Sequence, residues 1–108
     1  MADKIEQLKS NVEEIVLSWP GVKRKQVFGH QGFVRGNAMF AFFPEKGQAS
    51  FKAATSQEAE SLYTSGAAKP FVYNVRMQMR AWPVIPLRTD ADLQEVLTRM
   101  RSAYDAVG

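Results

Sequence analysis

The sequence predicts a two-layer α+β fold, in which helices pack on an antiparallel sheet of about five strands. Three amphipathic segments repeat apolar residues at helical spacing, one near each end of the chain and a shorter one between them. Short alternating or wholly apolar runs occupy the remaining segments, as is typical of strands. Glycine-containing turn sequences between neighbouring runs favour antiparallel hairpins. The expected order is α-β-β-β-α-β-β-α, within one domain that spans residues 1–108.

The first helix is predicted over residues 2–19, where apolar side chains share one face and most charged side chains share the other. Pro20 and Gly21 follow directly and end it. The apolar face consists of Ile5, Leu8, Val12, Ile15 and Val16. We therefore expect this helix to cover a flat apolar surface, such as one side of a sheet.

Residues 26–53 are predicted to form a three-stranded meander. After a first strand-like stretch, residues 36–37 fit a tight hairpin turn. Residues 38–43 are almost wholly apolar, which indicates a strand in the centre of the sheet. The turn-forming residues 44–47 then lead to residues 49–53, a short alternating strand with one buried face.

Gly29, Gly32 and Gly36 lie close together in this meander and invite comparison with a phosphate-binding loop. Their spacing matches neither G-x-G-x-x-G nor the P-loop, and a strand rather than a helix follows them. Glycine also permits positive φ angles and close approach of backbones. We therefore interpret these three glycines as the structural bend between neighbouring strands.

The two later helices are predicted from their caps. Thr55 and Glu58 match a capping box, and Gly66 ends the short helix that follows. Thr89 can cap the last helix, whose first turn contains two aspartates that favour the positive end of the helix dipole. Its apolar stripe consists of Leu93, Val96, Leu97, Met100 and Tyr104. Both segments therefore have a defined start and one apolar face to bury.

Residues 71–81 alternate regularly between apolar and polar side chains. This pattern fits either one long strand or a hairpin that turns near residues 74–78. Pro83 and Pro86 bracket the next apolar pair, and proline cannot donate a hydrogen bond to a sheet ladder. We therefore expect this last strand segment at an edge of the sheet.

The composition limits the function classes. The chain has 108 residues, 45% of them hydrophobic, and no cysteine, which excludes disulfides, Fe–S clusters and cysteine-ligated zinc. Met1 leads into an amphipathic segment that contains glutamate, so we expect no signal peptide, and no apolar run is long enough to cross a membrane. The sequence therefore predicts a cytoplasmic protein. Its net charge of +3 permits binding to nucleic acid without indicating it.

Three motifs resemble the TfoX N-terminal domain family. They are VFGHQGFVRGNAMFAF at residues 27–42, SFK at residues 50–52 and KPFVY at residues 69–73. The resemblance implies the fold shared with YjbR-like proteins and type III secretion chaperones. It also implies a non-catalytic regulatory or adaptor module that acts through protein–protein contacts. The family is named after a regulator of natural competence, and its N-terminal domain has no established catalytic residues.

The residues themselves give little support to catalysis. His30 is the only histidine, and no carboxylate lies within four residues of it. No serine occurs in a nucleophile-elbow or S-x-x-K setting. We therefore predict no catalytic or metal-binding residues, no cofactor and no small-molecule substrate. An activity centred on His30 is kept as an alternative to a half-exposed histidine in a turn.

Nucleic-acid binding is the main alternative function. Three adjacent basic residues follow the first helix, others are expected on strands, and a shared face would let them position phosphates. An ordinary solvated rim would give the same pattern. The candidate residues are Lys23, Arg24, Lys25, Arg35, Arg76 and Arg80.

A protein partner or a second copy of the chain is the expected binding partner. Alternation along residues 71–81 assigns Met77 and Met79 to the buried face of the strand. Val72 and Trp82 then fall on the opposite face. We therefore predict that Val72 and Trp82 form the protein interface.

Overall fold

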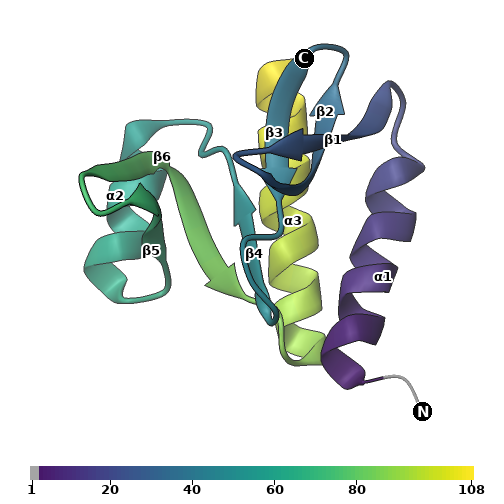
Figure 1. Cartoon of the computed structure of the whole chain (residues 1–108), viewed down its shortest axis with the longest axis horizontal. Helices are drawn as coiled ribbons and strands as arrows, with labels where there is room; N and C mark the ends of the chain where they lie inside the picture. The colour runs from purple at the N-terminus through teal and green to yellow at the C-terminus, as the bar shows by residue number, and fades with distance from the viewer. Residues whose placement is uncertain (1–2) are drawn as a thin grey trace.

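The computed structural model describes residues 3–108 and confirms the α+β fold, with three helices and one six-stranded antiparallel sheet (Figure 1). Ala2, the start of the expected first helix, lies outside the described residues, as does Met1. The elements are α1 (Lys4–Leu17), β1 (Val22–Val27), β2 (His30–Arg35), β3 (Ala38–Phe42), β4 (Gln48–Phe51), α2 (Ser56–Ser65), β5 (Lys69–Asn74), β6 (Met77–Pro86) and α3 (Asp90–Val107).

Strand β1 is the element that the expected order lacked. It contains Lys23, Arg24 and Lys25, which we had placed between the first helix and the first strand. Among residues 3–108 the strand pairs only with β2, and Val27 is its one buried residue. A strand at the edge of a sheet with polar side chains on both faces shows no alternation of polarity, so the sequence pattern did not reveal it.

The strands follow the order β1-β2-β3-β4-β6-β5 across the sheet. Strand β6 therefore lies between β4 and β5, and the prediction that its prolines mark a sheet edge is wrong. Pro83 is tolerated because the β5–β6 register shifts beside it, directly after its pairing with Pro70. Residues 71–81 form a hairpin rather than one long strand, because β5 ends at Asn74 and β6 begins at Met77.

Two of the three glycines stand at bends. Gly29 has a φ angle of +80° in the β1–β2 turn, and Gly36 has a φ angle of +62° in the β2–β3 turn. Gly32 instead lies inside β2, so its assignment to a bend is wrong. A Cβ atom there would lie 2.6 Å from Cγ2 of Val27 and 2.7 Å from the carbonyl oxygen of Ala41. Gly32 is therefore required by close packing.

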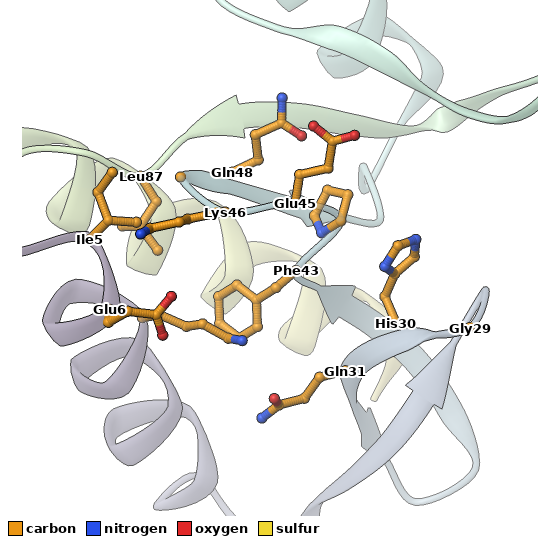
Figure 2. A pocket seen from close by; sticks show the side chains of 13 residues that line it. Ile5, Glu6, Gly29, His30, Gln31, Phe43, Glu45, Lys46, Gln48 and Leu87 are labelled. Atoms are coloured by element: carbon orange, nitrogen blue, oxygen red, sulfur yellow. The ribbon is translucent and has the colours of Figure 1, made fainter. Parts of the chain in front are cut away.

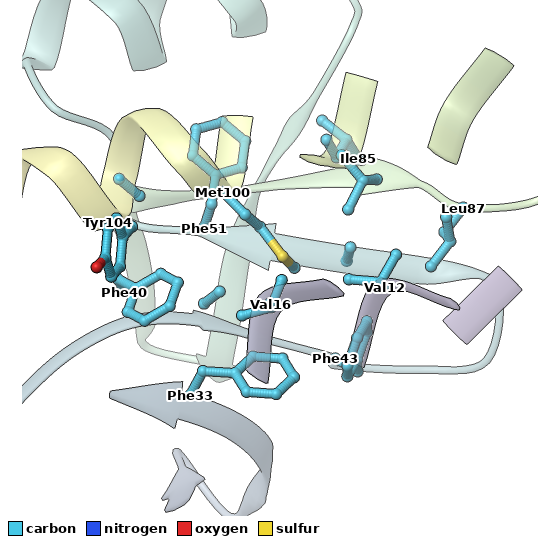
Figure 3. Close-up of a cluster of buried hydrophobic side chains, with 14 of the residues drawn as sticks. Val12, Val16, Phe33, Phe40, Phe43, Phe51, Ile85, Leu87, Met100 and Tyr104 are labelled. Carbon is cyan, nitrogen blue, oxygen red and sulfur yellow. The ribbon is translucent and has the colours of Figure 1, made fainter. Parts of the chain in front are cut away.

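The main core lies between the sheet and helices α1 and α3 (Figure 3). Val12 and Val16 of α1 and Met100 of α3 meet Phe33 and Phe40 of the sheet, and all five side chains are at most 1% exposed. Each fully buried side chain of this size contributes about 1.5–3 kcal/mol to folding. This burial fixes the two long helices on one face of the sheet.

The helix caps agree with the sequence in most respects. Thr89 and Asp92 form a complete capping box at the start of α3. Thr55 caps α2, but the carboxylate of Glu58 accepts a hydrogen bond from the amide of Ala54 rather than that of Thr55. Gly66 ends α2 with a left-handed φ angle of +80°. No helix among residues 3–108 has the length and apolar character needed to cross a membrane.

A second hydrophobic cluster lies apart from the main core. Strand residues Val27, Phe42, Phe71 and Trp82 form its buried part, and Phe28 of the β1–β2 turn packs against them. No helix residue belongs to this cluster. It therefore holds together the β1–β2 turn and the β5–β6 hairpin, which lie toward opposite edges of the sheet.

Candidate functional site

The β5–β6 hairpin presents large apolar side chains to solvent. Val75, in the turn, is 99% exposed, and three neighbours are about half exposed. Exposed apolar side chains that gather in one place mark sites of protein contact. The hairpin lies at the end of the molecule away from α1 and α3 (Figure 1). We call Val72, Tyr73, Val75 and Met77 the hairpin surface; it spans both faces of the hairpin, because Val72 and Tyr73 are consecutive in β5.

The structure reverses the faces expected for Trp82 and Met77. Val72 is exposed, as expected, but Trp82 is only 5% exposed and packs in the second cluster. Met77, which we had assigned to the buried face, is 48% exposed. Residues 80–82 of β6 have no partner in β5, because Pro83 pairs with Pro70 while Met79 pairs with Phe71. A strict alternation between residues 71 and 82 therefore does not hold across this irregularity.

The base of the hairpin is anchored to α2 by Arg80. Its guanidinium donates hydrogen bonds to both carboxylate oxygens of Glu60, at 2.6–3.0 Å. The hydroxyl of Tyr63 donates to the carbonyl of Arg80 at 2.7 Å, and the guanidinium lies 4.9 Å from the Tyr63 ring centroid. Burial raises the pKa of Tyr63, so its hydroxyl stays protonated and able to donate at neutral pH. These contacts hold the base of the hairpin against α2.

The Glu60–Arg80 pair predicts a loss of stability in acid. The hydrogen bond from Arg80 lowers the pKa of Glu60 below its ordinary value of 4.5. A carboxylate with a lowered pKa in the folded state stabilises that state above its unfolded pKa, and this contribution disappears as the pH falls through the folded pKa. Between about pH 6 and about pH 3, the wild-type urea midpoint should therefore fall more than that of Glu60→Gln.

Glu14→Gln is the matched control, since the carboxylate of Glu14 makes no ion pair within residues 3–108. Its urea midpoint should follow that of the wild type at both pH values. Equal acid sensitivity of Glu60→Gln and the wild type would contradict the proposed role of the pair.

The turn of the hairpin is shaped by Asn74, whose side-chain oxygen accepts a hydrogen bond from the amide of Arg76 at 2.9 Å. An asparagine that bonds the backbone two residues on mimics a backbone turn and fixes its shape. Val75 lies between these residues and is held out into solvent. The hairpin surface is therefore formed before any partner arrives.

Phe28 links the hairpin to the other end of the sheet. Its φ angle is +53°, an uncommon value for a bulky residue. The Phe28 ring centroid lies 5.6 Å from that of Phe71 and 6.0 Å from that of Tyr73. It also packs edge-on against Trp82 at 5.4 Å. These ring contacts offset the backbone strain at Phe28. The contact with Tyr73 also holds that side chain of the hairpin surface in place.

His30 borders two shallow cavities. The first, about 340 Å³, lies between the start of α1, the β1–β2 turn and the β3–β4 connection (Figure 2). The second, about 320 Å³, lies beside β5. The His30 ring stacks on Phe42 at 5.9 Å. Within residues 3–108 no group of three His, Asp or Glu side chains is placed to hold a metal ion.

The six basic candidates do not form one surface. Arg24 pairs with Glu13 at 3.1 Å, and Arg80 is held by Glu60. Arg35 donates to the carbonyl of Tyr104 at 3.0 Å and lies over its ring. Of the remaining three, Lys23 and Lys25 lie on β1 and Arg76 lies in the hairpin turn. Strand β1 and the β5–β6 hairpin occupy opposite ends of the strand order, so Lys23 and Lys25 share no strand pairing with Arg76.

Sequence reasoning missed three members of the hairpin surface: Tyr73, Val75 and Met77. A usable signal was present, since a hairpin that turns near residues 74–78 places Val75 in the turn, where no neighbouring strand can cover it. The exposure of Tyr73 and Met77 depends on which other elements pack against the hairpin, which no local pattern specifies. Comparison of the sequence with models of known protein families finds no match, and neither does comparison with curated proteins.

Proposed function

We propose that this chain is a non-catalytic regulatory or adaptor module of the TfoX N-terminal type that binds a partner protein in the cytoplasm through the hairpin surface. The observation that carries the proposal is the exposure of the hairpin surface, with Val75 at 99%. Burying apolar area contributes about 25 cal/mol per Å², so a partner that covers these side chains gains affinity from each of them. The motifs at residues 27–42, 50–52 and 69–73 support the family assignment.

A protein partner suits this surface better than nucleic acid does. The backbone of a nucleic acid is bound by gathered cationic side chains, whereas three of the six candidates here are engaged by Glu13, Glu60 or the carbonyl of Tyr104. Binding of nucleic acid through Lys23 and Lys25, which are exposed on β1, is the alternative proposal. The two surfaces lie on different strands, so they can be altered separately.

The proposal predicts that three substitutions remove partner binding. In the variant Tyr73→Ser, Val75→Ser and Met77→Ser, all three replaced side chains are at least 48% exposed, so the fold should persist. The immobilised chain is mixed with an extract of the cells that encode it, and retained proteins are quantified by mass spectrometry. Retention of a partner should fall by about tenfold or more, as expected when a central apolar anchor is lost.

The matched control is Lys23→Ser with Lys25→Ser, which removes two exposed charges from β1. This variant should retain the same proteins as the wild type. The proposal fails if the triple variant retains all of them. Loss of binding by the lysine variant alone, together with salt-sensitive binding of labelled duplex DNA by the wild type, would instead favour the nucleic-acid alternative.

A further inference from the structure

Strand β5 offers an unpaired backbone edge. It is the last strand of the sheet order, and among the described residues its outer side pairs with no other strand. Pro70 is opposite Pro83 of β6, and neither residue has an amide hydrogen to exchange across the ladder. In an antiparallel pair the backbone groups of such residues point away from the partner strand. The extra residues of the register shift beside Pro70, residues 80–82, belong to β6, so we infer that β5 keeps its own alternation and that the amide and carbonyl of Val72 also face outward.

A groove with apolar and polar walls runs beside β5. The cavity of about 320 Å³ is bordered by β5 residues, by Phe28 of the β1–β2 turn and by Val84 of β6, and its polar side is formed by His30, Glu45 and Gln48. Tyr73 and Phe71 form aromatic walls, and both rings contact Phe28. A strand that pairs with β5 would place alternate side chains toward this face of the sheet. The groove can therefore select one apolar or aromatic side chain.

The charges around β5 indicate what the added strand carries. Lys69 begins the strand and Arg76 follows its end, and neither forms an ion pair within residues 3–108. Strand β5 itself contains no acidic residue. Antiparallel pairing with β5 of a second copy would bring Lys69 of one chain toward Arg76 of the other, and like charges across strands are unfavourable. A segment with carboxylates at both ends is complementary.

We propose that β5 accepts an extended segment of the partner protein as a seventh strand. The segment carries an apolar or aromatic side chain that enters the groove, flanked by Asp or Glu residues that face Lys69 and Arg76. Main-chain hydrogen bonds to the edge supply affinity in this mode of recognition, and the groove supplies selectivity. This inference rests on the proposed function and specifies how the partner is held.

A library of random decapeptides displayed on phage is the probe. Peptides selected on the wild-type chain should share a β-branched or aromatic pattern with acidic residues at both ends. Val72→Pro removes the outward amide without touching the bonds to β6, and binding of the selected peptides should weaken by about tenfold or more. Val72→Ala keeps that amide and should weaken binding less. Circular dichroism checks that both variants are folded.

A second variant keeps the test decisive if Val72→Pro does not fold. Lys69→Glu with Arg76→Glu reverses the charge of two exposed side chains and should abolish binding of acidic peptides. Strand addition is overturned if no peptide is enriched, if the enriched peptides lack acidic ends, or if folded Val72→Pro binds as the wild type does. If Val72→Pro still retains the cellular partner and the serine triple variant does not, the proposed function stands and strand addition fails.

Discussion

Replacing Phe42 by alanine should lower the free energy of unfolding by about 3–5 kcal/mol, the range for removing a buried aromatic side chain. Phe42 is 0% exposed and forms the centre of the second cluster. Its ring centroid lies 4.8 Å from that of Phe71, 5.4 Å from that of Trp82 and 5.5 Å from that of Phe28. Urea denaturation followed by tryptophan fluorescence measures the loss, since Trp82 belongs to the same cluster.

The same substitution should also loosen the hairpin. Phe71 and Trp82 belong to β5 and β6, so a cavity at Phe42 removes a side-chain contact between these two strands and β3. Amide hydrogen exchange in residues 69–79 should accelerate more than exchange in α3. Met39→Ala is the control, because Met39 precedes Phe42 in the same strand but is 38% exposed. A loss for Phe42→Ala as small as that for Met39→Ala would refute the second cluster as a structural element.

Gly32→Ala should destabilise the fold by about 1–3 kcal/mol or more, as overpacking of a well-packed core does. The added methyl group would lie 2.6 Å from Cγ2 of Val27, 2.7 Å from the carbonyl oxygen of Ala41 and 2.9 Å from Cβ of Phe42. The carbonyl belongs to β3 and cannot move without displacing that strand. Thermal unfolding measured by circular dichroism gives the difference.

Gly29→Ala is the matched control for Gly32→Ala. Within residues 3–108, no heavy atom outside Gly29 and its two chain neighbours lies within 4 Å of a Cβ placed at Gly29, but its φ angle of +80° is strained for alanine. The expected cost is about 1–2 kcal/mol from the backbone alone. If Gly32→Ala destabilises the fold less than Gly29→Ala does, close packing does not explain why glycine is needed at position 32.

The parts of the fold that the sequence predicts are those specified by local chemistry. Thr55 and Thr89 bond backbone amides that a helix leaves free, so they mark where α2 and α3 begin. The apolar run at residues 38–43 has no polar face and therefore had to lie inside the sheet, where β3 is found between β2 and β4. In these segments the local signal and the tertiary environment agree.

The parts that could not be predicted depend on how one segment pairs with or packs against another, not on the pattern within a single segment. The exposed side chains of β1 carry no signal of burial, and only the ladder to β2 makes this segment a strand. The burial of Trp82 depends on the irregular β5–β6 register, which turns its side chain to the face opposite to the one expected from alternation. The engagement of Arg24 and Arg80 depends on helices α1 and α2, whose glutamates lie 11 and 20 residues away in sequence. Local periodicity contains none of this information.

These contacts between elements also bear on the two functional hypotheses. Glu13 and Glu60 each occupy one of the arginines that nucleic-acid binding would have used. The second cluster and the Arg80–Glu60 pair both anchor the hairpin, and its apolar side chains lie outward. A surface that is fixed before binding loses less conformational entropy when a partner covers it.

The most direct test is a map of the contacted residues. The ¹⁵N-labelled chain is titrated with the protein that the wild type retains and the serine triple variant does not, and the change in each amide chemical shift is measured by NMR. We predict that the largest changes fall in residues 69–79, with residues 22–27 of β1 unchanged. Largest changes in residues 22–27, or around the cavity between α1 and His30, would contradict the assignment of the hairpin as the binding surface.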